Sequence, residues 1–271
     1  MKKAFISLVL LVCFSSGCIS GYGNNVSTGQ TQKQAITVLA AASLTESFTE
    51  IGKKFEQENP DIRVTFNFAG SQTLLQQLEQ GIPADVFASA NQKYMSDANE
   101  GGFVDSSESK VFAKNALIVI YPKSNPGNIQ VLADLSNPGL KIVIAAGEVP
   151  VGKYTLEFLD KTSDTSSNLP ADFKVGFMKN VVSYENTVKS VVSKVMLGEA
   201  DAGVVYLTDV TGDAQNELVV IEIPTEQNVI ATYPIAVLKS SQNTVLSQAF
   251  VDFILSEEGQ GILQDYGFIN P

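Results

Sequence analysis

The chain has 271 residues, with 18 Lys and Arg against 29 Asp and Glu, which gives a formal net charge of −11. It contains no histidine, so Ser-His-Asp triads, Cys-His dyads and histidine-ligated metal sites are excluded. The acidic balance argues against a nucleic-acid-binding protein, because such proteins need a basic surface. Hydrophobic residues make up 44% of the chain, which is enough for a sizeable core in one large domain or two lobes.

Residues 1–17 have the pattern of a signal peptide. Two lysines precede an apolar run at residues 4–14, which is too short to span a bilayer comfortably. Small residues then precede Cys18, as in the signal of lipoproteins, whose cysteine becomes the lipidated N-terminus. The match is imperfect, because Ser15 stands where leucine is usual, and ordinary secretion with an incidental Cys18 is the alternative. We predict a signal peptide at 1–17 and lipidation at Cys18.

Residues 18–34 are predicted to form a flexible tether. The segment is rich in Gly, Ser, Asn, Gln and Thr and contains almost no large apolar residue. Only one cysteine remains after cleavage before Cys18, which excludes an intramolecular disulfide. No later apolar run is long enough to cross a membrane. We therefore expect an extracytoplasmic protein, anchored to the outer face of the cell membrane or periplasmic.

The next part of the chain alternates predicted strands and helices. Apolar, β-branched runs and alternating patterns predict strands at residues 36–41, 62–68 and 85–89. Helical spacing of Leu44, Phe48, Ile51 and Phe55 predicts a helix at residues 44–58, and another is predicted at 73–80. The resulting β-α-β-α-β order is typical of a parallel sheet covered by helices.

The remaining two thirds of the chain repeat this theme. Strands are predicted at residues 116–121, 142–146, 203–206, 219–223 and 230–238, and helices at residues 153–160, 187–197, 245–255 and 257–266. An α/β chain of this length fits two lobes better than one. No Gly/Ser-rich linker interrupts residues 35–271, so two lobes would have to be joined by ordered strands.

Four predicted junctions place a small or hydroxyl residue where a strand ends and a helix begins. They lie at Ser43, Ser71, Pro150 and the pair Asn186 and Thr187. Helix N-termini expose unpaired N–H groups and carry partial positive charge, so several of them at one sheet edge can bind an anion without Arg or Lys. The alternative is that these residues only cap their helices, and the spacing of Ser43 and Glu46 matches a capping box.

Other candidate sites carry weaker signals. Five carboxylates could form an acid/base pair or hold Ca²⁺, but no calcium-loop spacing is present, and we interpret them as solvated: Asp85, Glu148, Glu185, Asp201 and Asp209. The Ser-x-x-Lys match from Ser107 to Lys110 lies in a polar stretch and is interpreted as chance. Tyr206 ends an apolar strand and is either a core aromatic residue or a pocket donor.

Six short motifs occur together along residues 35–271. In chain order they span residues 40–45, 70–75, 81–90, 149–154, 203–206 and 233–236 (AAASLT, GSQTLL, GIPADVFASA, VPVGKY, GVVY and YPIA). In this order they resemble the molybdate-binding proteins of ABC importers. The resemblance implies a class II periplasmic-binding-protein fold, in which two α/β lobes joined by two crossover strands hold an oxyanion between them. The crossovers would lie near residues 116–121 and 230–238, with lobe one at 35–115 and 229–271 and lobe two at 116–228.

The resemblance also implies the ligand contacts and partners. The oxyanion, molybdate and by its similar size tungstate, would be bound by Ser43, Ser71, Val151, Val188 and Tyr206. The family often has alanine at the position of Val151, and Glu148 keeps open an expanded coordination. The resemblance implies no enzyme, no cofactor, no direct cation site and no nucleic acid, but a monomer that delivers its ligand to a membrane permease and its ATPase. A sulfate- or phosphate-binding protein, a lipid-anchored oxyanion sensor, and an enzyme acting on oxyanion esters are the alternatives.

Overall fold

The computed structural model describes residues 33–163 and 168–271, and Lys33–Pro271 form one compact unit. The predicted signal peptide (1–17), the predicted lipidation site Cys18 and nearly all of the predicted tether (18–34) lie outside the described residues. Within the described ranges, no helix has the length and apolar character needed to cross a bilayer.

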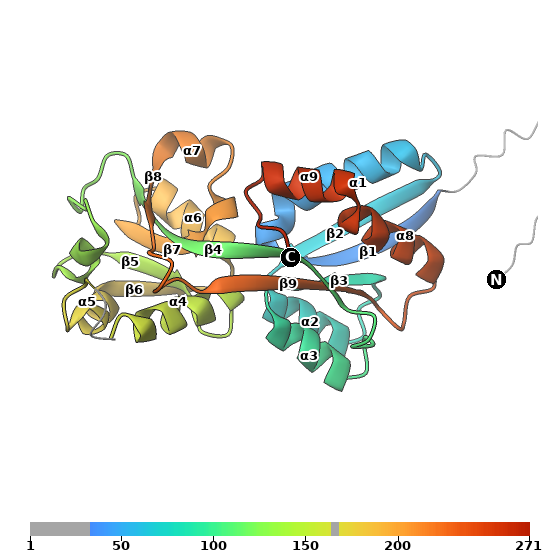
Figure 1. Cartoon of the computed structure of the whole chain (residues 1–271), viewed down its shortest axis with the longest axis horizontal. Coiled ribbons are helices and arrows are strands. Elements are labelled where there is room, and N and C mark those ends of the chain that lie inside the picture. The colour runs from blue at the N-terminus through green and yellow to red at the C-terminus, as the bar shows by residue number, and fades with distance from the viewer. Residues whose placement is uncertain (1–32, 164–167) are drawn as a thin grey trace, which may run out of the picture. The chain divides into compact units, whose positions relative to one another are not determined.

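The described residues form a nine-stranded sheet (Figure 1). The strands are β1 (Gln34–Ala41), β2 (Ile62–Ala69), β3 (Val86–Ala88), β4 (Lys110–Pro122), β5 (Ile142–Ala145), β6 (Val181–Glu185), β7 (Ala202–Tyr206), β8 (Leu218–Glu222) and β9 (Ile230–Val237). Their order across the sheet is β2-β1-β3-β9-β4-β7-β5-β6, and β8 pairs with β4.

The N-terminal strands form the parallel arrangement predicted from the β-α-β-α-β order. β1 lies between β2 and β3 and is parallel to both, with Val38 opposite Phe66 on one side and Val86 on the other. Successive side chains of a strand point to opposite faces. Accordingly, Val38 belongs to one buried hydrophobic cluster and Leu39 to another. Because β1 is buried on both faces, its sequence is a continuous apolar run and not an alternating one.

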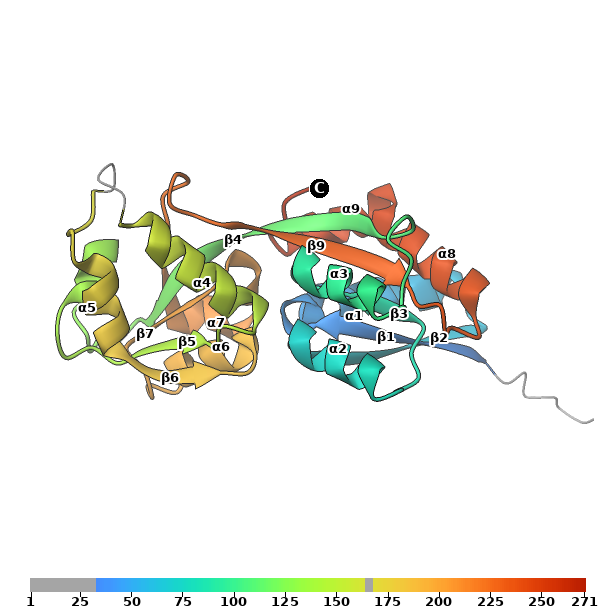
Figure 2. The ribbon, with the colours of Figure 1, turned by 90° about the horizontal axis from the view of Figure 1, so that it is seen from below.

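Two long antiparallel strands, β4 and β9, connect the two halves of the sheet (Figure 2). Residues 110–116 of β4 pair with β9, and residues 117–122 pair with β7 and β8. We call β2, β1, β3, β9 and residues 110–116 the first half, and the remaining strands the second half. The sequence predicted only residues 116–121 of β4, because Lys110 and Lys114 interrupt the apolar pattern of its first part and a bulge shifts the register between Val111 and Ala113.

Helices cover both faces of the sheet. They are α1 (Thr45–Glu58), α2 (Ser71–Glu79), α3 (Gln92–Glu100), α4 (Pro150–Lys161), α5 (Phe173–Asn180), α6 (Val188–Met196), α7 (Asp213–Glu217), α8 (Thr244–Leu255) and α9 (Glu257–Asp265), with 3-10 turns η1 (Ala42–Leu44), η2 (Leu132–Ser136) and η3 (Leu207–Asp209). In the first half, α1, α8 and α9 pack on one face, and α2 and α3 pack on the other (Figure 1). The sequence missed α3, α5, α7 and the edge strand β6.

Candidate functional site

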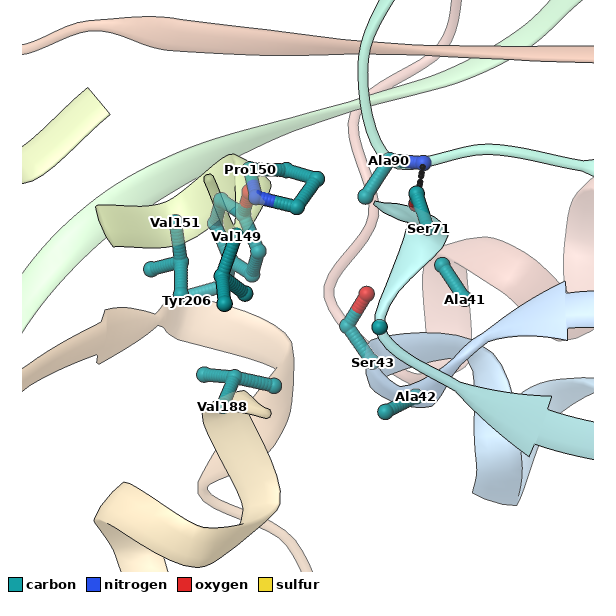
Figure 3. A pocket seen from close by; sticks show the side chains of 11 residues that line it. Ala41, Ala42, Ser43, Ser71, Ala90, Val149, Pro150, Val151, Val188 and Tyr206 are labelled. Atoms are coloured by element: carbon teal, nitrogen blue, oxygen red, sulfur yellow. Dashed lines mark hydrogen bonds between the residues drawn. The ribbon is translucent and has the colours of Figure 1, made fainter. Parts of the chain in front are cut away.

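A small pocket lies between the two halves of the sheet (Figure 3). Its cavity volume is about 20 Å³. Its lining consists of Ala41, Ala42, Ser43, Gly70, Ser71, Ala90, Val149, Pro150, Val151, Val188 and Tyr206. All of these residues are uncharged. The pocket therefore offers neutral hydrogen-bond groups and no full charge to a ligand.

The five residues predicted as ligand contacts all line this pocket. Ser43 follows β1 and Ser71 follows β2, both in the first half of the sheet. Val151, Val188 and Tyr206 lie at the carboxyl ends of β5, β6 and β7 in the second half. This is the edge at which open α/β sheets bind ligands. The fold thus brings together five positions that are spread over more than half of the chain.

Neither serine caps its helix, so the capping interpretation is wrong for both. Ser43 lies inside η1, and α1 has Leu44 at its N-cap with no side-chain cap bond. The Oγ of Ser43 lies instead 3.0 Å from the hydroxyl of Tyr233. Ser71 is the first residue of α2, and its Oγ accepts a hydrogen bond from the backbone N–H of Ala90 at 3.0 Å. Each serine is therefore held by a group far away in the sequence.

The starts of α4 and α6 supply backbone donors. Pro150 occupies the first turn of α4 as predicted, and Thr187 caps α6 by accepting the N–H of Ser190. Val151 and Val188 lie in these first turns, where N–H groups have no partner inside the helix. Gly152 is required beside Val151, because a Cβ there would lie 2.0 Å from the carbonyl oxygen of Ala146.

Tyr206 brings a phenol without a partner to the pocket. Its side chain is 1% exposed, and among the described residues its hydroxyl finds no hydrogen-bond partner. Burial, and next the neighbouring Tyr233, raise the pKa of Tyr206 well above its ordinary value. The phenol therefore keeps its proton at neutral pH and remains a donor. A buried unsatisfied hydroxyl is costly, so this group indicates a site that is completed by a ligand.

None of the five candidate carboxylates lines the pocket. Asp85 accepts bonds from the backbone N–H of Thr37 and the hydroxyl of Ser241, and Asp201 accepts the backbone N–H of Lys141. Glu185 forms an ion pair with Lys194. The side chain of Glu148 is exposed and does not line the pocket, which leaves an expanded coordination without support. Among the described residues, no group of three or more His, Cys, Asp or Glu could hold a metal ion.

Asp85 and Asp209 were predicted as solvated, and this is wrong for both: Asp85 is buried away from the pocket, and Asp209 is buried beside it. One carboxylate oxygen of Asp209 accepts the backbone N–H of Tyr206 at 3.1 Å, and the other lies 3.3 Å from Nζ of Lys189. Lys189 also contacts Glu46, at 2.7 Å. Burial raises the pKa of Asp209 to about 6, although Lys189 acts in the opposite direction. Burial alone would lower the pKa of Lys189, but Asp209 and Glu46 outweigh it and raise that pKa.

We expect the charge on Asp209 to destabilise the unliganded protein above pH 6. Its pKa is higher in the folded state than the ordinary value of 3.8, so folding favours the protonated form, and this stability is lost as the pH rises through about 6. A rise of roughly two pKa units corresponds to about 3 kcal/mol. Urea unfolding of the wild type and Asp209→Asn at pH 4 and pH 7 measures this. From pH 4 to pH 7, the free energy of unfolding of the wild type should fall relative to that of the variant. The same difference between the two proteins at both pH values would contradict the expectation.

Three contacts, that of Lys189 with Glu46 among them, join the two halves of the sheet around the pocket. Lys189 on α6 bonds Glu46 on α1, and the side chain of Gln72 donates to the carbonyl of Asn186 at 3.1 Å. The hydroxyl of Tyr94 donates to the carbonyl of Glu148. The sequence patterns did not reveal these contacts, because each joins residues more than 50 positions apart. They hold the two sides of the pocket together.

Comparisons with known proteins find solute-binding proteins, with molybdate-binding and sulfate-binding proteins among the similar chains. A family model described as bacterial extracellular solute-binding protein matches residues 36–269. The molybdate-binding protein ModA of Mycobacterium tuberculosis is 36% identical over 97% of this chain and 95% of its own length. ModA of Escherichia coli is 30% identical over 86% of this chain and 88% of its own length. The solved periplasmic molybdate-binding protein of Azotobacter vinelandii, 19% identical over 87% and 99% of the two chains, has a TM-score of 0.75 and shows the same fold.

Proposed function

Because this chain belongs to the family of bacterial extracellular solute-binding proteins, we propose that it is the substrate-binding subunit of an ABC importer and captures molybdate, and tungstate with it, in the pocket described above. The predicted periplasmic-binding-protein fold and the resemblance to molybdate-binding proteins are confirmed. The family consists of binding proteins and not of enzymes. The observation that carries the proposal is the convergence of five donor positions on one pocket with an uncharged lining.

The donors suit a tetrahedral dianion. Ser43 and Ser71 would each give a hydroxyl and a backbone N–H, Val151 and Val188 a backbone N–H, and Tyr206 its phenol. This is roughly two donors for each of the four oxygens. Three of the N–H groups belong to the first turns of α2, α4 and α6, whose partial positive charge favours an anion. Hydrogen bonds to an ionised ligand in a dry pocket are stronger than those between neutral groups.

The acidic charge of the chain is compatible with this ligand. The net charge repels a dianion at long range, but salt screens the repulsion over about 8 Å. Attraction therefore comes from local donors. The ligand would bridge lobe one (35–115 and 229–271) and lobe two (116–228) and shift the population toward the closed form. The contacts between Lys189 and Glu46 and between Gln72 and Asn186 would add to closure.

The N-terminal segment fits this role. With a signal peptide at residues 1–17 and a lipidated Cys18, the protein would be tethered to the outer face of the cell membrane, within reach of its permease and ATPase. Cleavage before Cys18 with addition of lipid would be detected by mass spectrometry of the N-terminal peptide. An unmodified Cys18 would leave a free periplasmic form of the same binding protein.

Calorimetric titration of residues 33–271, the compact unit, with molybdate, tungstate, sulfate and phosphate tests the proposed ligand. We expect tight binding of molybdate or tungstate with little binding of sulfate, because selectivity against the smaller sulfate tetrahedron would come from the size of the pocket. Tight binding of sulfate or phosphate instead would support the same pocket as the binding site but would contradict molybdate as its ligand. No binding of any of the four would contradict the proposal.

A further inference from the structure

Asn228 lies where the two halves of the sheet meet. β9 pairs with residues 110–116 of β4 and β8 pairs with residues 118–122, so Leu117 lies between the stretches that these two strands cover. β7 begins to pair with β4 at Leu117. The partners of β4 therefore change at this one residue, and the buried side chain of Asn228 bonds to it.

The amide of Asn228 bonds both main-chain groups of Leu117. Its oxygen accepts the N–H of Leu117 at 3.0 Å and that of Val229 at 2.8 Å. Its nitrogen donates to the carbonyl of Leu117 at 3.0 Å and to that of Ile223 at 3.3 Å. A flipped amide would face N–H groups with its own N–H and carbonyls with its own oxygen, so these four bonds fix its orientation. One side chain thus joins β4 to the residue after β8 and to the residue before β9.

The main chain of Asn228 also anchors α4. Its carbonyl accepts a hydrogen bond from Nζ of Lys161 at 2.5 Å. Lys161 is the last residue of α4, and the first turn of this helix places Val151 at the pocket. A helix that lines the pocket at its N-terminus is therefore attached, at its C-terminus, to the point where the partners of β4 change.

These contacts bear on how the two lobes would move. β4 and β9 connect the two halves of the sheet, and such segments bend where regular pairing stops, because hinges form at the ends of elements. Two strands that bend independently allow one lobe to twist as well as to close. A side chain that is bonded to both strands keeps their bends together. It can follow the bend by rotating about its own two torsions while its bonds persist.

We propose that Asn228 is a positioning residue of the hinge: it couples the bends of β4 and β9, so that lobe two closes onto lobe one along a single path. This inference rests on the proposed function, in which the ligand bridges the two lobes. Without the coupling, the unliganded lobes would sample more relative orientations, and fewer of these would bring the donors of lobe one opposite those of lobe two. A smaller fraction of competent orientations weakens the apparent affinity in proportion.

Distances between spin labels in the two lobes test this coupling. Residues 33–271 contain no cysteine, so Gln76→Cys on α2 and Ser193→Cys on α6 give one exposed labelling site in each lobe. Pulsed electron paramagnetic resonance then gives the distribution of the distance between the labels, with and without molybdate. The test variant is Asn228→Ala, which removes the four side-chain bonds.

Asn180→Ala is the matched control, because it also truncates a buried asparagine that bonds main-chain groups. Asn180 is 5% exposed, and its amide nitrogen donates to the carbonyls of Leu135 and Asn137 at 2.9 Å and 2.6 Å. All three residues lie within lobe two and outside the segments that connect the lobes. A general loosening of the fold would affect the control as well, whereas a lost coupling of the hinge would not.

We expect Asn228→Ala to widen the distance distribution of the unliganded protein about twofold, since more orientations are populated. Molybdate should bind about fivefold more weakly, the equivalent of one ordinary hydrogen bond. With molybdate bound, the mean distance should equal that of the wild type, because the ligand selects the closed form. Asn180→Ala should have a lower Tm but the distribution and the molybdate affinity of the wild type.

A folded Asn228→Ala variant with the distribution of the wild type, or an equal widening in Asn180→Ala, would overturn the inference. If Asn228→Ala does not fold, hydrogen exchange of the wild type decides. The N–H of Leu117 should be equally protected with and without molybdate, because the coupling requires its bond to Asn228 to persist in the open form. Loss of this protection without ligand would show that the bond breaks on opening and that the inference is wrong.

Failure of the proposed function is distinguishable from failure of this inference. A wild type that binds no molybdate would contradict the proposed function. A wild type that binds molybdate, together with a variant whose distribution does not widen, would contradict only the role of Asn228.

Discussion

The double substitution Ser43→Ala, Ser71→Ala is expected to weaken molybdate binding by about 10²- to 10⁴-fold. Each substitution removes a hydroxyl that would bond to a charged ligand, and such a bond contributes roughly 1.5–3 kcal/mol. Two losses sum to about 3–6 kcal/mol, and 1.4 kcal/mol corresponds to a factor of ten in Kd. The backbone N–H groups of both residues remain, so some affinity should persist. Calorimetric titration of the wild type and the double variant measures the change.

A matched control separates the ligand bonds from general damage. Ser47→Ala also truncates a buried serine, on α1, whose hydroxyl bonds the carbonyl of Leu44 and does not line the pocket. Its molybdate affinity should stay within about twofold of the wild type, since no ligand bond is lost. Ser71→Ala also leaves the N–H of Ala90 without its partner, so thermal unfolding of each variant is recorded alongside. Unchanged affinity in a folded double variant would contradict the site.

Tyr206→Phe is expected to have opposite effects on stability and on binding. Without ligand, the Tyr206 hydroxyl is buried and has no partner among the described residues, so its removal relieves a desolvation cost. A gain of about 1 kcal/mol would raise the Tm of a chain of this size by about 2–4 °C. With ligand, the variant lacks one donor to a charged anion, and molybdate should bind about 10- to 100-fold more weakly.

The two effects together distinguish a ligand-binding phenol from a structural one. If the hydroxyl had a structural partner, Tyr206→Phe would lower the Tm, since a buried bond would be broken. If the hydroxyl did not contact the ligand, affinity would be unchanged. Differential scanning calorimetry of the unliganded protein gives the Tm, and calorimetric titration gives the molybdate affinity. A lower Tm with wild-type affinity would contradict the role assigned to Tyr206.

Much of the first half of the sheet could be predicted from the sequence, because local patterns determine it. β1 is buried on both faces and has an apolar run, whereas the first part of β2 is buried on one face and alternates apolar and polar residues. The same local signals placed Ser43, Ser71 and Val151 at junctions between strands and helices. The parallel order then brings these junctions to one edge, whereas the five ligand contacts themselves were predicted from the resemblance and not from these local patterns.

The partners of these residues could not be predicted in the same way. Ser43 matched a capping box, yet its hydroxyl bonds Tyr233, 190 positions later in the chain. Asp209 resembled any solvated carboxylate, yet η3 places it in the core beside Lys189. Such pairings depend on how strands cross the sheet, and no local spacing records that. The edge strand β6 was not predicted, because its exposed Val182 and Tyr184 interrupt the alternation of apolar and polar residues that indicates a strand.

The buried cluster behind the pocket shows why these distant pairings matter for function. Asn115 lies in the part of β4 that pairs with β9, and Tyr233 lies on β9 itself. Both residues lie where β4 and β9 pair in the first half of the sheet, so the hydroxyl that bonds Ser43 is carried by paired strands and not by a loop. A rigid support on long paired strands holds a donor more accurately than a loop would.

The position of bound tungstate tests the central claim most directly. Crystals of residues 33–271 grown with tungstate would locate the metal by its anomalous scattering. We expect a single peak in the pocket, with the four oxygens bonded to Ser43, Ser71, Tyr206 and the backbone N–H groups of Val151 and Val188, and with no carboxylate among the contacts. A peak elsewhere, or one coordinated by Glu148 or Asp209, would contradict the proposed site.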